Sequence, residues 1–221
     1  MKKCISIPDF VQEFKLPNDS QCVTLLGDNR NIIDDLRIEG LQTNKDLSLT
    51  GLRLGGTAHC RDMHVGENLD CYGMKVGHYA YFNNTRVKGN ALFCNLGVGQ
   101  SNRKGYAYFS SMQVGGDADF SGANISVEAD FTKMQVGGAL FLCGAQLGDI
   151  DLQGVRAKLL DLEGAVIALE RIALERESET NNMSAEIPMR YSTFGIEAYK
   201  INAKTRIPYS LMKALGILRR V

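Results

Sequence analysis

The chain has 221 residues, and its 25 lysines and arginines balance 25 aspartates and glutamates, so the formal net charge is zero. This balance removes the simplest electrostatic argument for a nucleic-acid-binding protein. The 23 glycines against only 4 prolines indicate many tight turns rather than a flexible linker. No run reaches the roughly 18 apolar residues of a transmembrane helix, and the N-terminus lacks the apolar stretch of a signal peptide, which predicts a cytoplasmic protein.

Residues 1–29 precede a long regular region and are predicted to cover its N-terminal end. Asp9–Phe14 has the pattern of a short helical turn, and residues 21–27 (QCVTLLG) form a strand candidate. The end of a regular β-structure leaves unpaired strand edges, so we expect a covering segment there.

Residues 30–167 form an internal repeat with a unit of eleven residues. Three consecutive units read MQVGGDADFSG (112–122), ANISVEADFTK (123–133) and MQVGGALFLCG (134–144). The register extends back to a degenerate unit at 30–40, and the period falls to ten after residue 144. The unit that starts at Leu96 carries five extra residues, which predict a loop that returns to register at Tyr106.

Each unit has two pairs of apolar positions, the later pair being the seventh and ninth. The ninth position is phenylalanine in five central units, and the seventh is alanine in many. Apolar residues two apart indicate short strands with alternate side chains inward. Between the pairs lie Gly-Gly, Gly-Asp, Ser-Gly or Asn-Asn, which tolerate the positive φ of a sharp corner. The pattern predicts a mainly β fold, a parallel β-solenoid of about six turns with two units per turn, in which Phe120 and Phe131 meet inside.

The motif Ala118-Asp119-Phe120-Ser121-Gly122, followed by Ala123-Asn124-Ile125, resembles the pentapeptide-repeat family, whose units read A(D/N)LXX. Ala129-Asp130-Phe131, Ile150-Asp151-Leu152 and Leu160-Asp161-Leu162 match the same core. The resemblance covers roughly residues 30–167 and implies a right-handed, four-sided β-helix with the Leu/Phe and the small residue inside. The eleven-residue unit departs from the family pattern, because every second corner carries an extra residue.

Residues 168–221 change to helical character and are predicted to form a C-terminal cap or appendage. Helical patterns are found at Ala168–Arg176 and at Ser210–Arg220, with a mixed segment between them. The second helix places Leu211, Leu215 and Leu218 on one face. Eleven residues are too few for a stable isolated helix, so docking on the solenoid is favoured over contact with a second copy, another partner or an anionic membrane surface.

The cysteines and histidines lack the spacing of a metal site. The six cysteines are too sparse for a disulfide-built scaffold and include no CxxC pair, so we expect free thiols. In the repeat register Cys60 and Cys71 take inward positions, whereas His59 and His64 take outward ones. Because metal ligands must converge on one point, neither a metal nor another cofactor is predicted.

The sequence also lacks a catalytic motif. No GxSxG serine accompanies the three histidines, and the VGG glycines recur at one corner without the GK[ST] of a phosphate-binding loop. Cys94 and Cys143 take outward positions with no evident neighbouring charge that would activate them, so ordinary surface thiols are expected. The prediction is that the protein is not an enzyme.

Charge is distributed unevenly along the chain. Residues 71–116 contain five basic and no acidic residues, residues 117–163 contain eight acidic and three basic ones, and the chain from Glu186 onward is basic again. On a rod, separated patches of opposite charge steer association with a partner, although a plain solvated surface is the simpler interpretation.

Units two apart stack on the same side of a solenoid, so His59, Tyr81 and Tyr108 are predicted to form an outward aromatic column flanked by Arg53 and Lys75. Aromatic and basic side chains together are typical of protein interfaces, whereas a ladder that only stabilises the sheet is the slightly favoured alternative. The candidate partner-binding residues are His59, Tyr81, Tyr108, Arg53, Lys75, Arg103, Lys104, Lys213, Arg219 and Arg220.

These features favour a non-enzymatic, rigid solenoid that acts as a protein–protein interaction scaffold, including a bacterial effector delivered to a host cell. One alternative, implied by the resemblance, is a topoisomerase-directed DNA mimic, but such mimics have an acidic face and residues 71–116 contain no acids. Another is an enzyme of unknown type; solenoid acyltransferases, however, use a six-residue period. The expected partner is a protein rather than nucleic acid, with homodimerisation through a solenoid end or the C-terminal helix left open.

Overall fold

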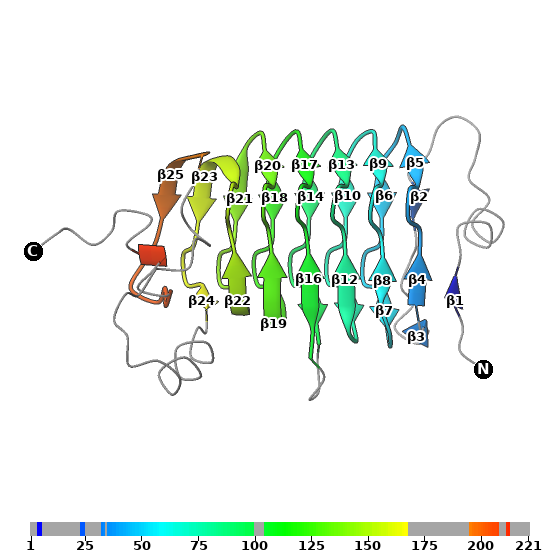
Figure 1. The fold of residues 1–221 in the computed structure, drawn as a ribbon, viewed down its shortest axis with the longest axis horizontal. Coiled ribbons are helices and arrows are strands. Elements are labelled where there is room, and N and C mark those ends of the chain that lie inside the picture. Colours follow the sequence, from blue (N-terminus) through cyan, green and yellow to red (C-terminus); the bar gives the residue numbers. More distant parts are fainter. Residues whose placement is uncertain are drawn as a thin grey trace, which may run out of the picture.

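A computed structural model describes residues 35–99, 104–167, 199–207 and 211–212, together with the backbone of residues 4–5, 23–24, 32–33 and 195–198. The described residues form a parallel β-solenoid of about six turns, with strands stacked side by side along the rod (Figure 1). In the regular part each residue pairs with the residue 22 positions later, as Leu47 pairs with Leu69. One coil therefore consists of two eleven-residue units, as predicted.

Each coil contributes short strands to four stacks, which we call the first to fourth faces in chain order. The first face contains β3 (Ile32–Ile33), β7 (Arg53–Leu54), β11 (Lys75–Val76), β15 (Gly97–Val98), the first halves of β19 (Asn124–Asp130) and β22 (Gln146–Asp151), and β24 (Val166–Ile167). The second face contains β1 (Cys4–Ile5), β4 (Asp35–Arg37), β8 (Ala58–His59), β12 (Tyr79–Tyr81), β16 (Tyr106–Tyr108) and the second halves of β19 and β22.

The other two faces are built in the same way. The third face contains β5 (Gln42–Thr43), β9 (His64–Val65), β13 (Arg86–Val87), β17 (Gln113–Val114), β20 (Gln135–Val136) and the start of β23 (Arg156–Asp161). The fourth face contains β2 (Val23–Thr24), β6 (Leu47–Ser48), β10 (Leu69–Asp70), β14 (Ala91–Leu92), β18 (Ala118–Asp119), β21 (Ala139–Phe141), the end of β23, and β25 (Gly195–Lys200).

The interior is filled by the first, third, seventh and ninth residues of the units, which alternate with outward side chains. At the ninth position, five phenylalanines are fully buried: Phe82, Phe93, Phe109, Phe120 and Phe131. Rings one coil apart stack, with centroids 5.2 Å apart for Phe109 and Phe131. Rings half a coil apart meet edge to face, as in the predicted contact of Phe120 with Phe131 at 4.9 Å. Ala118 and Ala129 are also fully buried, which confirms the predicted core.

Positive φ occurs at the Ser-Gly and Asn-Asn corners, as expected, but not at the Gly-Gly corners. The last residue of the unit has φ near +60° whether it is glycine, asparagine or another type, as in Gly144 (64°), Asn84 (58°) and Lys133 (58°). The turn is closed by a hydrogen bond from the first residue of the next unit to the ninth, as from Met134 N to Phe131 O at 3.0 Å. A turn in which the third residue has a positive φ and the second does not is typically a type II turn.

The Gly-Gly corners serve close packing between coils instead. Neither Gly115 nor Gly137 has a positive φ, so the expectation for these residues was wrong. A Cβ atom on Gly137 would overlap the carbonyl oxygen of Gly115 in the coil below, and one on Gly115 would overlap that of Lys88. These corners need glycine because the backbones of successive coils approach closely there.

Side-chain ladders also join the coils on the fourth face. The Asp46 carboxylate accepts a hydrogen bond from Asn68 N at 2.7 Å, and the Asn68 side-chain oxygen accepts one from Asn90 N at 2.8 Å. Asn90 and Asp117 continue the ladder with 2.8 Å bonds to the next coils. Each bond occupies a corner amide that the strand pairing leaves free.

The predicted loop leaves the register of the rod intact. Gly105 O accepts a hydrogen bond from Val127 N at 3.0 Å, and Gly105 N donates to Ser126 Oγ at 2.9 Å. Tyr106 then pairs with Tyr79 on one side and Glu128 on the other, so the strand stack continues across the insertion.

At the N-terminal end, β1 pairs with β4 and β2 pairs with β6. The strand candidate at 21–27 therefore contains a strand, and the helical turn predicted at Asp9–Phe14 lies outside the described residues.

The C-terminal region adds a strand where the sequence analysis expected helical character with a mixed middle segment. β25 pairs in parallel with β23, and Arg206 bridges to Val166, so residues 195–207 form a further half-coil. The open edge of β23 explains the strand, because its backbone groups need partners. Of the predicted helices, only Leu211 and Met212 are described; their backbone is helical, and the Leu211 side chain is fully buried.

Candidate functional site

The second face carries a cluster of outward aromatic side chains at the middle of the rod. β12 and β16 both read Tyr-Ala-Tyr, with the alanine buried and the tyrosines outward. Because the strands pair in register, Tyr79 lies beside Tyr106 and Tyr81 beside Tyr108. His59 on β8 precedes Tyr81 in the same column. We call these five residues the tyrosine platform.

The rings of the platform stack along the rod axis. The centroid distances are 5.5 Å for His59 and Tyr81, 5.1 Å for Tyr81 and Tyr108, and 5.5 Å for Tyr79 and Tyr106. Interplanar angles of 24°, 8° and 14° show that the rings are nearly parallel. Stacked rings cover one another's faces, so edges and hydroxyl groups form the outer surface, and Tyr79 remains 37% exposed.

The second face becomes acidic beyond the platform. In the next coil Glu128 pairs with Tyr106 and Asp130 with Tyr108, and the coil after that places Asp149 and Asp151 in the same columns. Burial and the neighbouring Tyr81 raise the pKa of Tyr108, with a smaller contribution from Glu128. The Tyr108 hydroxyl therefore stays protonated and available as a hydrogen-bond donor at neutral pH.

At the other end of the platform, His59 lies next to Glu39, with 3.3 Å between Nδ1 and Oε1. Burial and the nearby Arg37 lower the pKa of His59, although Glu39 acts in the opposite direction. Glu39 also pairs with Arg61 at 3.2 Å, and the Arg61 charge itself acts to lower the His59 pKa.

The predicted basic flank belongs to a different face. Arg53 and Lys75 pair with each other on the first face, one corner away from the platform. The Lys75 ammonium donates to Asn95 O at 2.8 Å, and burial, with Arg53 beside it, lowers the Lys75 pKa. Lys104 is exposed just before β16. The remaining candidates, Arg103, Lys213, Arg219 and Arg220, lie outside the described residues.

The cysteine and histidine positions follow the predicted alternation. Cys60 and Cys71 are fully buried, whereas His59 and His64 lie outward on the second and third faces. Within the described ranges, no three His, Cys, Asp or Glu side chains are grouped so that they could hold a metal ion.

The outward thiols lack the character of nucleophiles. Burial and a hydrogen bond with Asp119 raise the pKa of Cys94 to about 12, and burial with Asp161 nearby raises that of Cys143 to about 11. Thiol nucleophilicity depends on the thiolate, so both are poor nucleophiles at neutral pH.

Sequence reasoning identified His59, Tyr81 and Tyr108 as one column and missed the second column of Tyr79 and Tyr106. The signal was available, because the strand motif Tyr-Ala-Tyr at 79–81 and 106–108 places two outward rings on each strand.

Comparison of the chain with family models, with curated proteins and with solved structures gives no match. Among the residues that the structure describes, no helix has the length and apolar character needed to cross a membrane.

Proposed function

We propose that the protein is a non-enzymatic interaction scaffold whose tyrosine platform contacts a protein partner. The observation that carries the proposal is the concentration of four tyrosines and one histidine on three adjacent strands of a single face. The rigid backbone fixes these side chains before binding, which lowers the entropy cost of forming an interface.

Tyrosine suits such an interface because it offers a large contact area with only two side-chain torsions and a hydroxyl that hydrogen-bonds. The platform is bordered by Glu128 and Asp130, so a partner surface with basic residues beside a polar patch would complement it. Stabilisation of the sheet alone gives a weaker account, since the equivalent outward column of the fourth face, Asp70, Leu92, Asp119 and Phe141, is paired in the same way with a single aromatic residue.

The four stacks of strands, the type II turns and the paired inward residues support a divergent relationship to the pentapeptide-repeat family. A topoisomerase-directed DNA mimic is less well supported. The acidic part of the second face gives way to the tyrosine platform, and the third face carries Arg86 and Arg156.

The proposal is tested by photo-crosslinking from two faces. Tyr79 and Phe141 are each replaced by benzoylphenylalanine, a conservative change at either position because both side chains are aromatic and point outward. We expect the crosslinker at position 79, on the second face, to capture a partner protein and give a discrete crosslinked band. The crosslinker at position 141, on the fourth face, should give no band of that mass. The double variant Tyr81→Thr/Tyr108→Thr, in a protein that carries the crosslinker at 79, should lose the band while the fold is retained by circular dichroism. The same crosslinks from both faces would contradict the proposal.

A further inference from the structure

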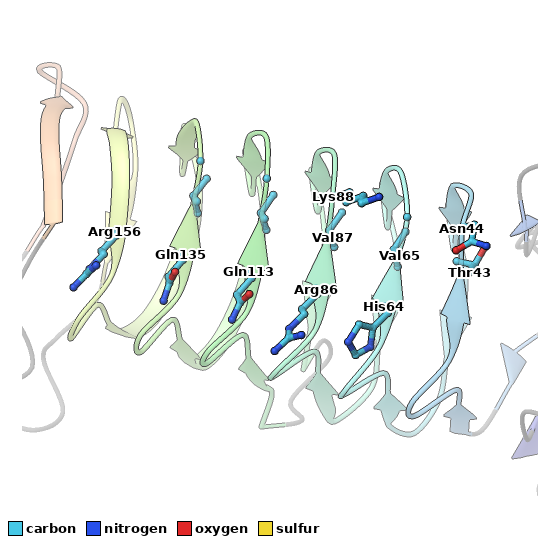
Figure 2. Close-up of a pocket in the computed structure, with 15 residues that line it drawn as sticks. Thr43, Asn44, His64, Val65, Arg86, Val87, Lys88, Gln113, Gln135 and Arg156 are labelled. Carbon is cyan, nitrogen blue, oxygen red and sulfur yellow. The ribbon is translucent and has the colours of Figure 1, made fainter.

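A second surface feature, a groove, runs along the third face of the rod. One outward side chain per coil forms a row along it, and Figure 2 shows Arg156, Gln135, Gln113, Arg86 and His64 side by side on successive strands. The groove has a volume of about 690 Å³. It is separate from the tyrosine platform, which lies on the second face.

The groove exists because the corner next to this row lacks side chains in several coils. Gly66, Gly115 and Gly137 take the fourth position of their units, where the backbones of successive coils nearly touch. A Cβ atom on Gly66 would lie 2.6 Å from the backbone of Asn44. The glycines thus leave a hollow between the corner and the row, which is also lined by residues such as Val114 and Val136, whose side chains are buried.

All charged side chains that line the groove are basic. Its lining includes Arg86, Lys88 and Arg156 and contains no aspartate or glutamate. Within the described part of the chain, neither arginine has a carboxylate partner, and both are exposed. Overall the chain is neutral, so this basic strip is a local arrangement rather than a consequence of net charge.

We propose that the groove binds an extended acidic peptide segment of a partner protein, running parallel to the rod axis. Arg86 and Arg156 are three coils apart, with Gln113 and Gln135 between them. At roughly 4.8 Å per strand, three coil spacings cover about 14 Å. An extended peptide rises roughly 3.4 Å per residue, so four residues also cover about 14 Å and return the side chain to the same side.

In this arrangement two carboxylates four residues apart meet the two guanidinium groups. The intervening glutamines supply both donors and acceptors, which match the amide groups of a peptide backbone. A nucleic acid carries a phosphate at every nucleotide and calls for a denser row of cations than this groove has, where Arg86 and Lys88 of one coil are separated from Arg156 by two neutral amides. The spacing of the row therefore favours a peptide.

The first experiment measures fluorescence anisotropy of labelled peptides of about ten residues with the full-length protein at low ionic strength. One peptide has two glutamates four residues apart, the second has them three apart, and the third has glutamines in their place. We expect the first to bind at least about threefold more tightly than the second, and the third more weakly than either. Equal affinity for the two spacings, no binding of the first peptide, or tighter binding of single-stranded oligothymidylate would overturn the proposal.

The second experiment uses variants on two faces. Arg86→Gln and Arg156→Gln should each weaken binding of the first peptide by about threefold, and together by about tenfold. Arg53→Gln is the matched control, because it removes an exposed arginine from the first face. An equal loss in the control would show non-specific attraction and overturn the proposal. Neither arginine belongs to the tyrosine platform, so failure here leaves the crosslinking result from position 79 unaffected.

Discussion

The ninth residue of each unit is the position on which the interior depends most. The Phe120 ring contacts three other aromatic rings of the column, with centroid distances of 4.7 Å to Phe93, 4.7 Å to Phe109 and 4.9 Å to Phe131. In a stack of coils each turn packs only on its neighbours, so a hole in one coil is not filled from elsewhere.

Phe120→Ala is therefore expected to lower the free energy of unfolding by about 3–5 kcal/mol. Urea denaturation followed by circular dichroism measures the change. Phe141→Ala is the matched control, because Phe141 points outward on β21 and is only half-buried, and it should cost far less. Equal losses for the two variants would contradict the assignment of the ninth position to the core.

His59 gives the platform a pH dependence. Burial lowers its pKa below the ordinary value of 6.5 in the folded protein, so the unfolded chain takes up the proton first as the pH falls. Stability contributed by neutral His59 is complete above about pH 6.5 and declines on acidification through that value.

We expect the melting temperature of the natural protein to fall more between pH 7.5 and pH 5.5 than that of a His59→Gln variant, because glutamine does not titrate. Differential scanning fluorimetry at both pH values makes the comparison. His64→Gln is a suitable control, since His64 is exposed on the third face. Identical shifts in the natural protein and His59→Gln would refute the assignment.

At the scale of the corner elements, glycine has two separate roles that the sequence alone did not distinguish. Gly137 lacks room for a Cβ, whereas Gly144 has φ of +64° with nothing within 4 Å of the added atom. Other units place asparagine at the position of Gly144, as Asn84 and Asn95 show. Asparagine tolerates this left-handed conformation better than most residues.

Gly144→Asn is expected to change stability by less than about 1 kcal/mol, whereas Gly137→Ala should cost at least about 2 kcal/mol because the coils must move apart. Thermal melts of the two single variants provide the test. A larger loss for Gly144→Asn than for Gly137→Ala would reverse the assignment of the two roles.

The eleven-residue period predicted the coil length, the inward positions and the column of His59, Tyr81 and Tyr108, because alternation fixes which side of a strand a residue occupies. It did not predict the groove, which depends on how closely the backbones of Asn44 and Gly66 approach at one corner. That distance is a property of stacked coils in three dimensions, and a glycine in the sequence does not reveal whether it serves a turn or a contact.

For the whole molecule, the two ends decide whether the rod is closed. The last half-coil, residues 195–207, follows a long excursion in sequence, and its pattern GIEAYK does not repeat the preceding units, so periodicity could not reveal it. It is attached by backbone pairing with β23 and by the Thr205 hydroxyl, which donates to Leu162 O at 2.9 Å. Leu211 then packs into the core from just beyond it.

Deletion of residues 208–221 removes Leu211 and is expected to lower the melting temperature and the solubility, because an apolar end of the core is uncovered. Leu211→Ala should reproduce part of the loss, while Met212→Ala, at a half-buried position, should have a smaller effect. Differential scanning fluorimetry and sedimentation of the three variants measure both properties. A truncated protein that melts at the same temperature yet loses a binding partner would identify the tail as an interaction element instead of a cap.

The late position of the last half-coil has a consequence for synthesis on the ribosome. Lys200 pairs with Asp161, which emerges 39 residues earlier. At roughly 5–20 residues per second, the growing rod presents the bare edge of β23 for about 2–8 s before its own closing strand arrives. During that interval the closing strands of neighbouring nascent chains on the same messenger RNA compete for this bare edge of β23. Slow translation of residues 168–200 is therefore expected to favour entangled multimers, and fast translation to favour monomers closed by their own β25.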